Sequence, residues 1–336
     1  MSALAVGMLA TQCRSAPTGA RFDSRGDLLL THAARRASSE VARTFQAGGG
    51  LVELMTSMAV SLGIALCALY LVALSSREFA RTEQDALLHD QAAYVFDVLA
   101  TALQQAGHVD ATQPTPQVAA RLAQGALDGL DDAAVPATSA GFQGTRPGSS
   151  SDALSVRFAG DALGRMRNCA GMPVPAAENA SDDRGWSVFH VATDRQGEPE
   201  LRCKYRGSSG WVSQAVAGGV TSFQLLYGLD PDGDGLPNDF VSASRLRALG
   251  MASGGAALSL WTRVVAVHVA LLMRSPQVVR SPALRKAVDL FGSEYAARHA
   301  VDDPGTTLAP QQLHPDRLYR QFDAVIFLGN SQRPPE

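Results

Sequence analysis

Acidic side chains follow one another closely in the stretch Asp230-Pro-Asp-Gly-Asp-Gly-Leu-Pro-Asn-Asp239. Carboxylates at positions 1, 3 and 5 and Gly at position 6 match the start of a calcium-binding loop, because Ca²⁺ prefers clustered oxygen ligands around a sharp turn. The bidentate acid of position 12 is missing, since that residue is Val241. An acidic turn without an ion is therefore the alternative to a partial calcium site. The ligands predicted for the calcium site are Asp230, Asp232, Asp234 and Asn238.

No set of residues in the sequence indicates catalysis. The 7 His are scattered, and the chain contains no Gly-x-Ser-x-Gly elbow, no phosphate-binding Walker loop and no His-Glu-x-x-His zinc motif. His190 and His268 fall in segments expected to be strands, where a single His without partners is weak evidence for a general base. We therefore predict that the chain is not an enzyme.

The composition fits one or two domains with a hydrophobic core, since 46% of the 336 residues are hydrophobic. Residues 1–48 hold six Arg and three acidic residues, so their charge of +3 leaves −6 on the remainder of a chain whose total is −3. A mildly acidic body argues against nucleic acid as a partner.

The element that must position everything else is the uncharged run Leu54–Leu74, which directly follows Glu53 and is 21 residues long. As a helix with about 1.5 Å rise per residue it spans roughly 31 Å, close to the ~30 Å hydrocarbon core of a bilayer. The Arg excess before the run keeps residues 1–48 in the cytoplasm by the positive-inside rule, so the C-terminal part is exported. The sequence predicts a single-pass membrane protein.

The cysteines agree with this topology. Cys13 lies before the membrane run and Cys67 lies within it, which leaves Cys169 and Cys203 in the exported part. In an oxidising compartment these two are expected to form a disulfide worth about 3 to 4 kcal/mol. Two free buried thiols are the alternative.

Beyond the membrane run the apolar residues continue at helical spacing up to Ala106, and Gly107 is a natural stop. Pro, Gly and Ser then predict loops. From Ala153 onward several short alternating segments, separated by turn residues, predict an antiparallel sheet. The expected parts are a leader (1–48), a transmembrane helix (49–74), its amphipathic continuation (75–107), a loop-rich linker (108–151) and a β-rich head (152–336).

The junction before the membrane run resembles the class III signal of type IV prepilins, in which a Gly precedes the new N-terminus and a Glu stands at the fifth mature position. In this chain Gly48 matches the last leader residue and Gly49 the first mature residue. Glu53 then matches the Glu at the fifth mature position. The usual aromatic residue and Thr after the cleavage point are both Gly here. A plain single-pass anchor, with Glu53 at headgroup depth where a charge is inexpensive, is the alternative.

The exported part resembles the PilW family of minor pilins. The similarity is carried by a succession of short motifs. These are Asp152-Ala-Leu-Ser-Val-Arg-Phe158, Asn168-Cys-Ala-Gly171, Leu201-Arg-Cys203, Gly219-Val-Thr-Ser-Phe-Gln-Leu-Leu-Tyr-Gly-Leu-Asp230, Asp232-Gly-Asp-Gly235, Trp261-Thr-Arg-Val-Val-Ala-Val267 and Leu271-Leu-Met-Arg-Ser275. The end at Gly329-Asn330 departs from the Arg-Asn pair common in the family.

The resemblance implies an α+β pilin fold, with a long N-terminal helix packed on an antiparallel sheet. It also implies cleavage and N-methylation by prepilin peptidase, residence in the inner membrane with a periplasmic head, and transfer to a pilus tip. The implied partners are other minor pilins, the major pilin and a large tip adhesin, and Glu53 would pair with the N-terminal ammonium of a neighbouring subunit. The alternatives are a J-like minor pseudopilin of type II secretion and an uncleaved, membrane-anchored periplasmic binding protein.

Overall fold

The computed structural model describes residues 50–109, 120, 122, 125–177, 179, 183–252, 260–279, 286–299 and 301–329. The predicted leader and the predicted cleavage position between Gly48 and Gly49 lie outside these residues. The chain divides into two compact units, Met1–Gly63 and Ile64–Glu336. The described part of the first unit is the beginning of helix α1, and the second unit contains the β-rich head.

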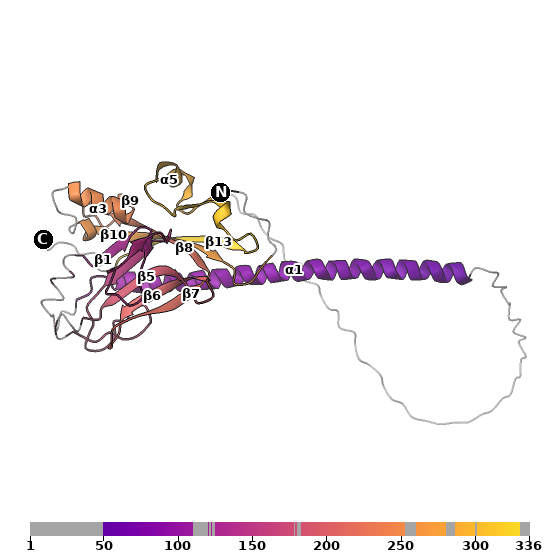
Figure 1. Cartoon of the computed structure of the whole chain (residues 1–336), viewed down its shortest axis with the longest axis horizontal. Coiled ribbons are helices and arrows are strands. Elements are labelled where there is room, and N and C mark those ends of the chain that lie inside the picture. The colour runs from indigo at the N-terminus through magenta and orange to yellow at the C-terminus, as the bar shows by residue number, and fades with distance from the viewer. Residues whose placement is uncertain are drawn as a thin grey trace, which may run out of the picture. The chain divides into compact units, whose positions relative to one another are not determined.

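Helix α1 runs over Gly50–Gln104 and contains 55 residues (Figure 1). It is uninterrupted because the stretch 51–104 contains no Pro and a single Gly. The helix ends two residues before the predicted end at Ala106, and a turn leads to Gly107, which has φ +72°. That left-handed conformation favours Gly and terminates helices. The amide of Gly107 donates to the carbonyl of Arg157 at 2.9 Å, which attaches the end of the helix to the head.

The strands of the head form two main sheets, and all pairings are antiparallel, as predicted. The sequence did not separate the strands into two sheets. The five-stranded sheet has the order β1 (Leu127–Leu130), β4 (Ala153–Arg157), β5 (Trp186–Thr193), β6 (Pro199–Arg206) and β7 (Trp211–Gly218). The four-stranded sheet has the order β13 (Tyr319–Phe327), β10 (Val264–Arg274), β8 (Val220–Leu229) and β9 (Asp239–Val241).

Smaller elements complete the described head. Two ribbons of two strands each pair β2 with β3 and β11 with β12. Their bounds, with those of the short helices, are β2 (Ala133–Ala134), β3 (Arg146–Pro147), β11 (Val288–Asp289), β12 (Thr307–Leu308), α3 (Ala243–Ala252), α5 (Gly292–His299) and the 3₁₀ helix η1 (Pro310–Gln312).

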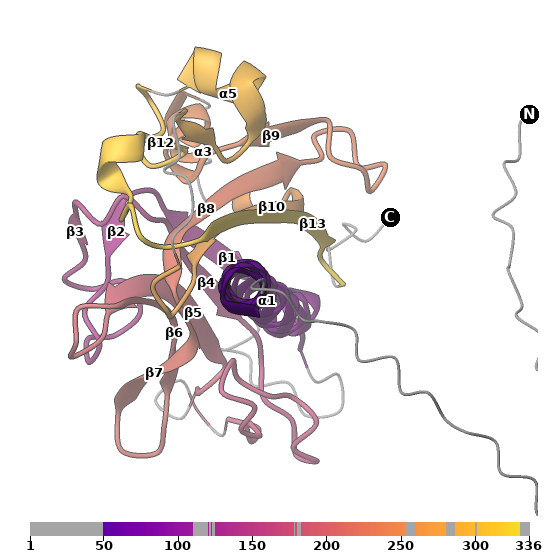
Figure 2. The same cartoon turned by 90° about the vertical axis from the view of Figure 1, so that its right-hand side faces the viewer.

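The core of the head is built around the C-terminal part of α1, which lies between the two main sheets (Figure 2). Leu88, Val95 and Leu99 are completely buried at helical spacing. They belong to one cluster with Leu154 of β4 and Phe223 of β8, so the helix contacts both sheets. The head covers the C-terminal part of the predicted amphipathic stripe, which includes Val95 and Leu99. The prediction is wrong for three other members of the stripe, because Phe79, Leu87 and Tyr94 are exposed.

The prediction of a loop-rich linker over 108–151 is wrong in part, because β1, β2 and β3 fall in this range. Strand β1 is the edge of the five-stranded sheet, where Leu127 pairs with Val156 and Gly129 with Leu154. Gly129 hides this strand in the sequence, because Gly is depleted in strands. Its place follows from packing: a Cβ on Gly129 would lie 1.8 Å from the hydroxyl oxygen of Tyr227.

The contrast between the two parts of α1 predicts different effects of one substitution. Leu99→Ala removes a side chain that is 0% exposed and should lower the free energy of unfolding of the head by about 2 to 5 kcal/mol. Leu69→Ala is the matched control, since Leu69 is 66% exposed, and it should leave unfolding of the head unchanged. Near-UV circular dichroism of the full chain in detergent during heating measures both. Equal losses in the two variants would contradict this arrangement.

Candidate functional site

The N-terminal half of α1 carries an exposed apolar surface with one carboxylate. Glu53 lies in the first turn, where the positive end of the helix dipole favours an acid, and it is exposed. Its carbonyl oxygen accepts a hydrogen bond from the Thr56 hydroxyl at 3.0 Å. Large apolar side chains surround this turn. They include Leu51, Val52, Leu54, Met55 and Met58, each at least 60% exposed.

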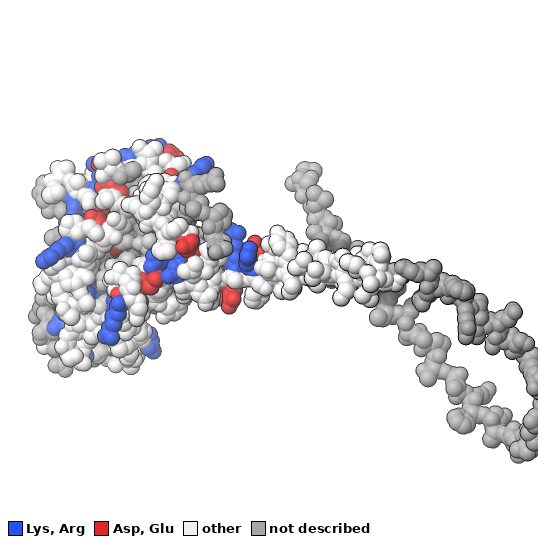
Figure 3. All heavy atoms as spheres, turned by 45° about the vertical axis from the view of Figure 1, so that its right-hand side comes forward, with Lys and Arg blue, Asp and Glu red and all other residues white. Residues whose placement is uncertain are grey.

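This helix is long and apolar enough to cross a membrane once. No charged residue occurs between Glu53 and Arg77, and the apolar part of α1 is seen as a white stretch before the charged spheres begin (Figure 3). Within the described residues nothing covers the 18-residue apolar window, of which 0% is buried. An apolar surface of this extent is stable in lipid or against other apolar helices, and not in water.

The acidic turn between β8 and β9 brings together three of the four predicted calcium ligands. Asp230, Asp232 and Asp234 each offer an oxygen within 4.8 Å of the others. Asn238 is also close, but its Nδ2 donates to Asp232 Oδ2 at 3.2 Å, so the amide nitrogen faces the turn where a calcium ligand would present an oxygen. Val241, at position 12, lies in β9 and pairs with Tyr227. The turn therefore lacks part of the ligand set of a calcium-binding loop.

Asp230 already has hydrogen-bond donors from the protein. Its carboxylate accepts from the amides of Gly233 at 2.6 Å and Gly235 at 2.7 Å. Burial raises the pKa of Asp230, but these amide hydrogen bonds outweigh burial and hold the pKa below its usual range. The charge of Asp230 thus organises the turn itself, in agreement with the alternative of an acidic turn.

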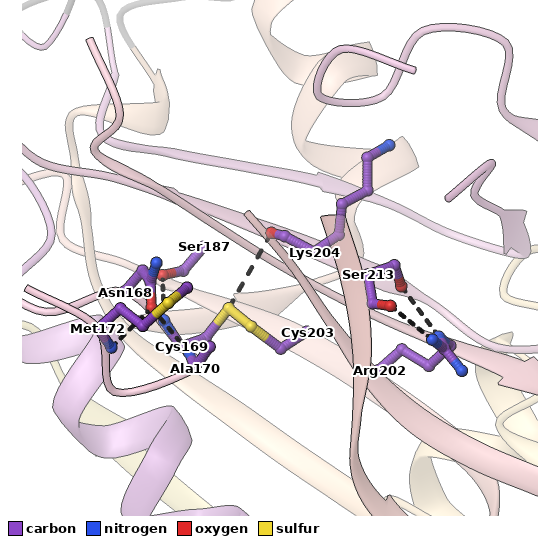
Figure 4. The surroundings of a disulfide bond; sticks show 9 residues. All are labelled: Asn168, Cys169, Ala170, Met172, Ser187, Arg202, Cys203, Lys204 and Ser213. Carbon is purple, nitrogen blue, oxygen red and sulfur yellow. Dashed lines mark hydrogen bonds between the residues drawn. A yellow bond between two sulfur atoms is a disulfide. The ribbon is translucent and has the colours of Figure 1, made fainter. Parts of the chain in front are cut away.

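The structure confirms the disulfide between Cys169 and Cys203, whose Cα atoms are 5.8 Å apart. The Cys169 amide donates to Ser187 Oγ at 3.0 Å, and Asn168 Oδ1 accepts from two amides of the same turn. Cys203 lies in β6, so the bridge attaches this turn to the five-stranded sheet (Figure 4). Of the other two cysteines, Cys67 is free and exposed on α1, and Cys13 lies outside the described residues.

Next to the disulfide, three basic side chains converge on the five-stranded sheet. The Lys204 side chain points away from the disulfide (Figure 4), and its Nζ donates to the carbonyls of Pro136 and Gly141, both at 2.7 Å. Burial lowers the pKa of Lys204 to about 8. His190 is directly opposite Arg202 in the β5–β6 register and is 1% exposed. Burial, and then the charges of Lys204 and Arg202, lower the pKa of His190 to about 4.

The expectation that His190 and His268 are packing or surface residues agrees with their surroundings. His190 Nδ1 has no hydrogen-bond partner within the described chain. His268 Nε2 lies 3.1 Å from Asp323 Oδ2 on the neighbouring strand β13, and its ring contacts Phe291 edge-on.

A second group of acids was missed by sequence reasoning. Asp131, Asp152 and Asp303 come from separate segments and offer oxygens within 4.8 Å of one another. Burial raises the pKa of Asp152 well above its usual range, and the charges of Asp131 and Asp303 raise it further. No spacing rule identifies this group, because only the pairing of β1 with β4 and the return of the chain after α5 bring the three together.

The head can now be compared with known proteins. Residues 188–330 match the family model of the type IV pilus-assembly protein W, PilW. This range runs from β5 to the end of β13 and contains Cys203 and the acidic turn. The resemblance predicted from the motifs is thereby confirmed over this range.

The chain is similar to a type IV-like pilin from Thermus thermophilus, with 17% sequence identity, a TM-score of 0.35, and coverage of 73% of this chain and 97% of that chain. At this level the likeness adds no argument to the PilW match. No curated protein matches the chain.

The depressed pKa of His190 predicts how stability depends on pH. The unfolded chain binds a proton to His190 below about pH 6.5, whereas the folded chain does so only near pH 4. Stability should therefore fall by about 3 kcal/mol as the pH drops from 6.5 to 4, because the unfolded state takes up the proton first. In His190→Gln this part of the slope should disappear. The free energy of unfolding from urea titrations at several pH values measures it.

His314→Gln is the matched control, because His314 is exposed on a loop and should leave the slope unchanged. An identical pH slope in His190→Gln and in the unaltered chain would show that His190 is not held neutral by the fold.

Proposed function

We propose that this chain is a minor pilin of the PilW type, which takes part in starting type IV pilus assembly and is located near the pilus tip. The observation that supports this most is the combination of a head that matches PilW with a helix whose exposed half is apolar and carries a single carboxylate. A pilus assembly protein needs both: a folded head, and a helix that moves from lipid into a polymer of other helices.

In the first stage the apolar half of α1 anchors the protein in the inner membrane, with residues 1–48 on the cytoplasmic side. The Arg excess in residues 1–48 supports this orientation. Prepilin peptidase would then cut between Gly48 and Gly49 and methylate the new amine. The chain is the substrate in this step, and we propose no catalytic role for its own residues.

In the second stage Glu53 directs the packing between subunits. When the exposed apolar side chains around it pack against neighbouring helices, the carboxylate leaves water and must find a positive partner, because an unpaired buried charge costs several kcal/mol. Cleavage after Gly48 creates such a partner, the terminal ammonium of a neighbouring pilin. Pairing at this one position would select one register among helices whose remaining surface is uniformly apolar.

The head needs no rearrangement during this transfer. Its core is completed by the C-terminal part of α1 and includes Leu88, Leu99 and Phe223, all fully buried. The disulfide between Cys169 and Cys203 adds stability expected of a protein that folds in an oxidising compartment. The proposed partners of the assembled state are other minor pilins, the major pilin and a large tip adhesin.

The role of Glu53 is tested by Glu53→Gln. The variant should reach the membrane in normal amounts, because a neutral amide does not impair insertion, but its amount in sheared pili should fall by roughly a hundredfold, the equivalent of about 3 kcal/mol for an unpaired buried ammonium. Immunoblots of membrane and pilus fractions measure both quantities. Glu78→Gln is the matched control, since Glu78 is exposed on the same helix beyond the apolar run.

Normal incorporation of Glu53→Gln would contradict the pairing.

A strain that lacks the chain should lose surface pili and twitching motility while enzyme secretion continues. Loss of secretion with normal pili would instead identify a minor pseudopilin of type II secretion.

A further inference from the structure

Three carboxylates that belong neither to α1 nor to the exposed acidic turn meet inside the head. Asp131 follows β1, Asp152 precedes β4, and Asp303 lies between α5 and β12. One oxygen of each lies within 4.8 Å of the others. Asp152 is 1% exposed and Asp303 is 2% exposed, while Asp131 is half-buried. The group is therefore almost closed to solvent.

Among the described residues, neutral backbone amides donate hydrogen bonds to Asp131 and Asp152. Asp131 accepts from the amides of Ala243 at 3.0 Å and Ser244 at 2.8 Å, at the N-terminus of α3. Asp152 accepts from the amides of Leu225 at 2.8 Å and Asp132 at 3.3 Å. None of the ion pairs between described residues includes any of the three acids.

One of the two carboxylate oxygens of Asp303 has no hydrogen-bond donor among the described residues. Its Oδ2 accepts from the hydroxyl of Tyr295 at 2.8 Å, but its Oδ1 is buried and has no hydrogen-bond partner within the described chain. A buried oxygen left without a partner destabilises the folded state, and it does so more when it is charged. Among the described residues this oxygen has neither a hydrogen-bond donor nor an ion-pair partner.

An independent side chain directs a second unpaired oxygen into the same region. Tyr227 on β8 is completely buried, and its hydroxyl has no hydrogen-bond partner within the described chain. Its ring is fixed edge-on against Trp261, with 4.8 Å between ring centroids, and its hydroxyl lies against Gly129 of β1, two residues before Asp131. Burial, and then the charges of Asp152, Asp131 and Asp128, raise the pKa of this hydroxyl, while the charge of Arg247 lowers it.

Gln224 also lies on β8, three residues before Tyr227, so its side chain is on the opposite face of the sheet. Its Nε2 donates to the carbonyl of Ser150 at 3.0 Å, and a Cβ on Gly305 would lie 2.6 Å from the same nitrogen, so the amide lies against the loop that carries Asp303. Its Oε1 is buried and has no partner within the described chain. Gln224 and Tyr227 thus add one buried, unpaired oxygen each, from opposite faces of β8, to the unpaired oxygen of Asp303.

One ligand accounts for all of these features. Carboxylates this close cannot all be ionised unless a positive charge lies between them. The available ligand atoms are all oxygens, and hard cations prefer such sets, Ca²⁺ in particular because it accepts irregular geometry and completes its shell with waters. We propose that Asp131, Asp152 and Asp303 bind one divalent cation of the calcium class inside the head.

Such a cation would join three parts of the head. Asp131 and Asp152 are at the ends of the paired strands β1 and β4, the Asp152 amide also donates to the Phe223 carbonyl of β8 at 2.8 Å, and Asp303 belongs to the segment after α5. Since the unfolded chain separates the three acids, binding stabilises the folded head alone. The inference is independent of the proposed role in pili.

The experiment uses the full chain in detergent, stripped with EDTA and then titrated with calcium chloride. Equilibrium dialysis measures bound calcium, and near-UV circular dichroism measures Tm. We expect one bound calcium per chain and a Tm that rises by several degrees on saturation. Asp303→Asn should lower the calcium affinity by about tenfold or more, so that the rise in Tm requires at least about ten times more calcium.

The matched control is Asp234→Asn in the exposed acidic turn, which should bind calcium like the unaltered chain. Asp152→Asn is the second variant, and the near-UV spectrum in EDTA shows whether each variant is folded before calcium is added. Three outcomes would overturn the proposal: no calcium-dependent rise in Tm, a loss of binding in Asp234→Asn while Asp303→Asn still binds, or a Tm that rises as the pH falls and ignores calcium. The last outcome would mean that shared protons neutralise the acids.

Discussion

The burial of one face of α1 between two antiparallel sheets is the interaction on which the rest of the head depends. Each sheet presents an apolar face that must be covered, and residues such as Leu154 and Phe223 meet the helix from opposite sides in one cluster. Without the helix both faces would be open to water. The helix in turn is held by specific contacts, among them the ion pair of Asp85 with Arg320 on β13 and the edge-on contact of His89 with Phe322.

The same helix has an opposite requirement in its N-terminal half. There the large apolar side chains are exposed, and the described chain offers them no cover. The environment that stabilises this half must come from outside the subunit, first as lipid and then, in our account, as the helices of other pilins. One half of α1 is buried in its own head, and the other half is left for external partners. Substitutions in the head and substitutions on the assembly surface should therefore have separate effects.

Much of this arrangement could be predicted from the sequence, because it depends on local patterns. The uncharged run after Glu53, the apolar stripe beyond it and the alternation in segments such as Trp186–Val191 each reflect the period of one element. The disulfide followed from the number of cysteines in the exported part. The PilW motifs identified the head over the range that the family model matches.

What could not be predicted depends on contacts between distant segments. Strand β1 contains Gly129, which is present because the Tyr227 hydroxyl occupies the space of a side chain, and that contact joins residues about a hundred positions apart. The division of the strands between two sheets is also set by tertiary packing. The acids Asp131, Asp152 and Asp303 show the same limit, since no spacing in the sequence distinguishes them from ordinary exposed acids, whereas the turn at Asp230 attracted attention by spacing alone.

The central claim is that the apolar half of α1, once freed from the basic segment before it, leaves the membrane and becomes part of a pilus. Mass spectrometry of this protein in purified pili tests the claim most directly. The account predicts an N-terminal peptide that begins with a methylated Gly49. Recovery of the chain solely from the inner membrane, with residues 1–48 still attached, would contradict it.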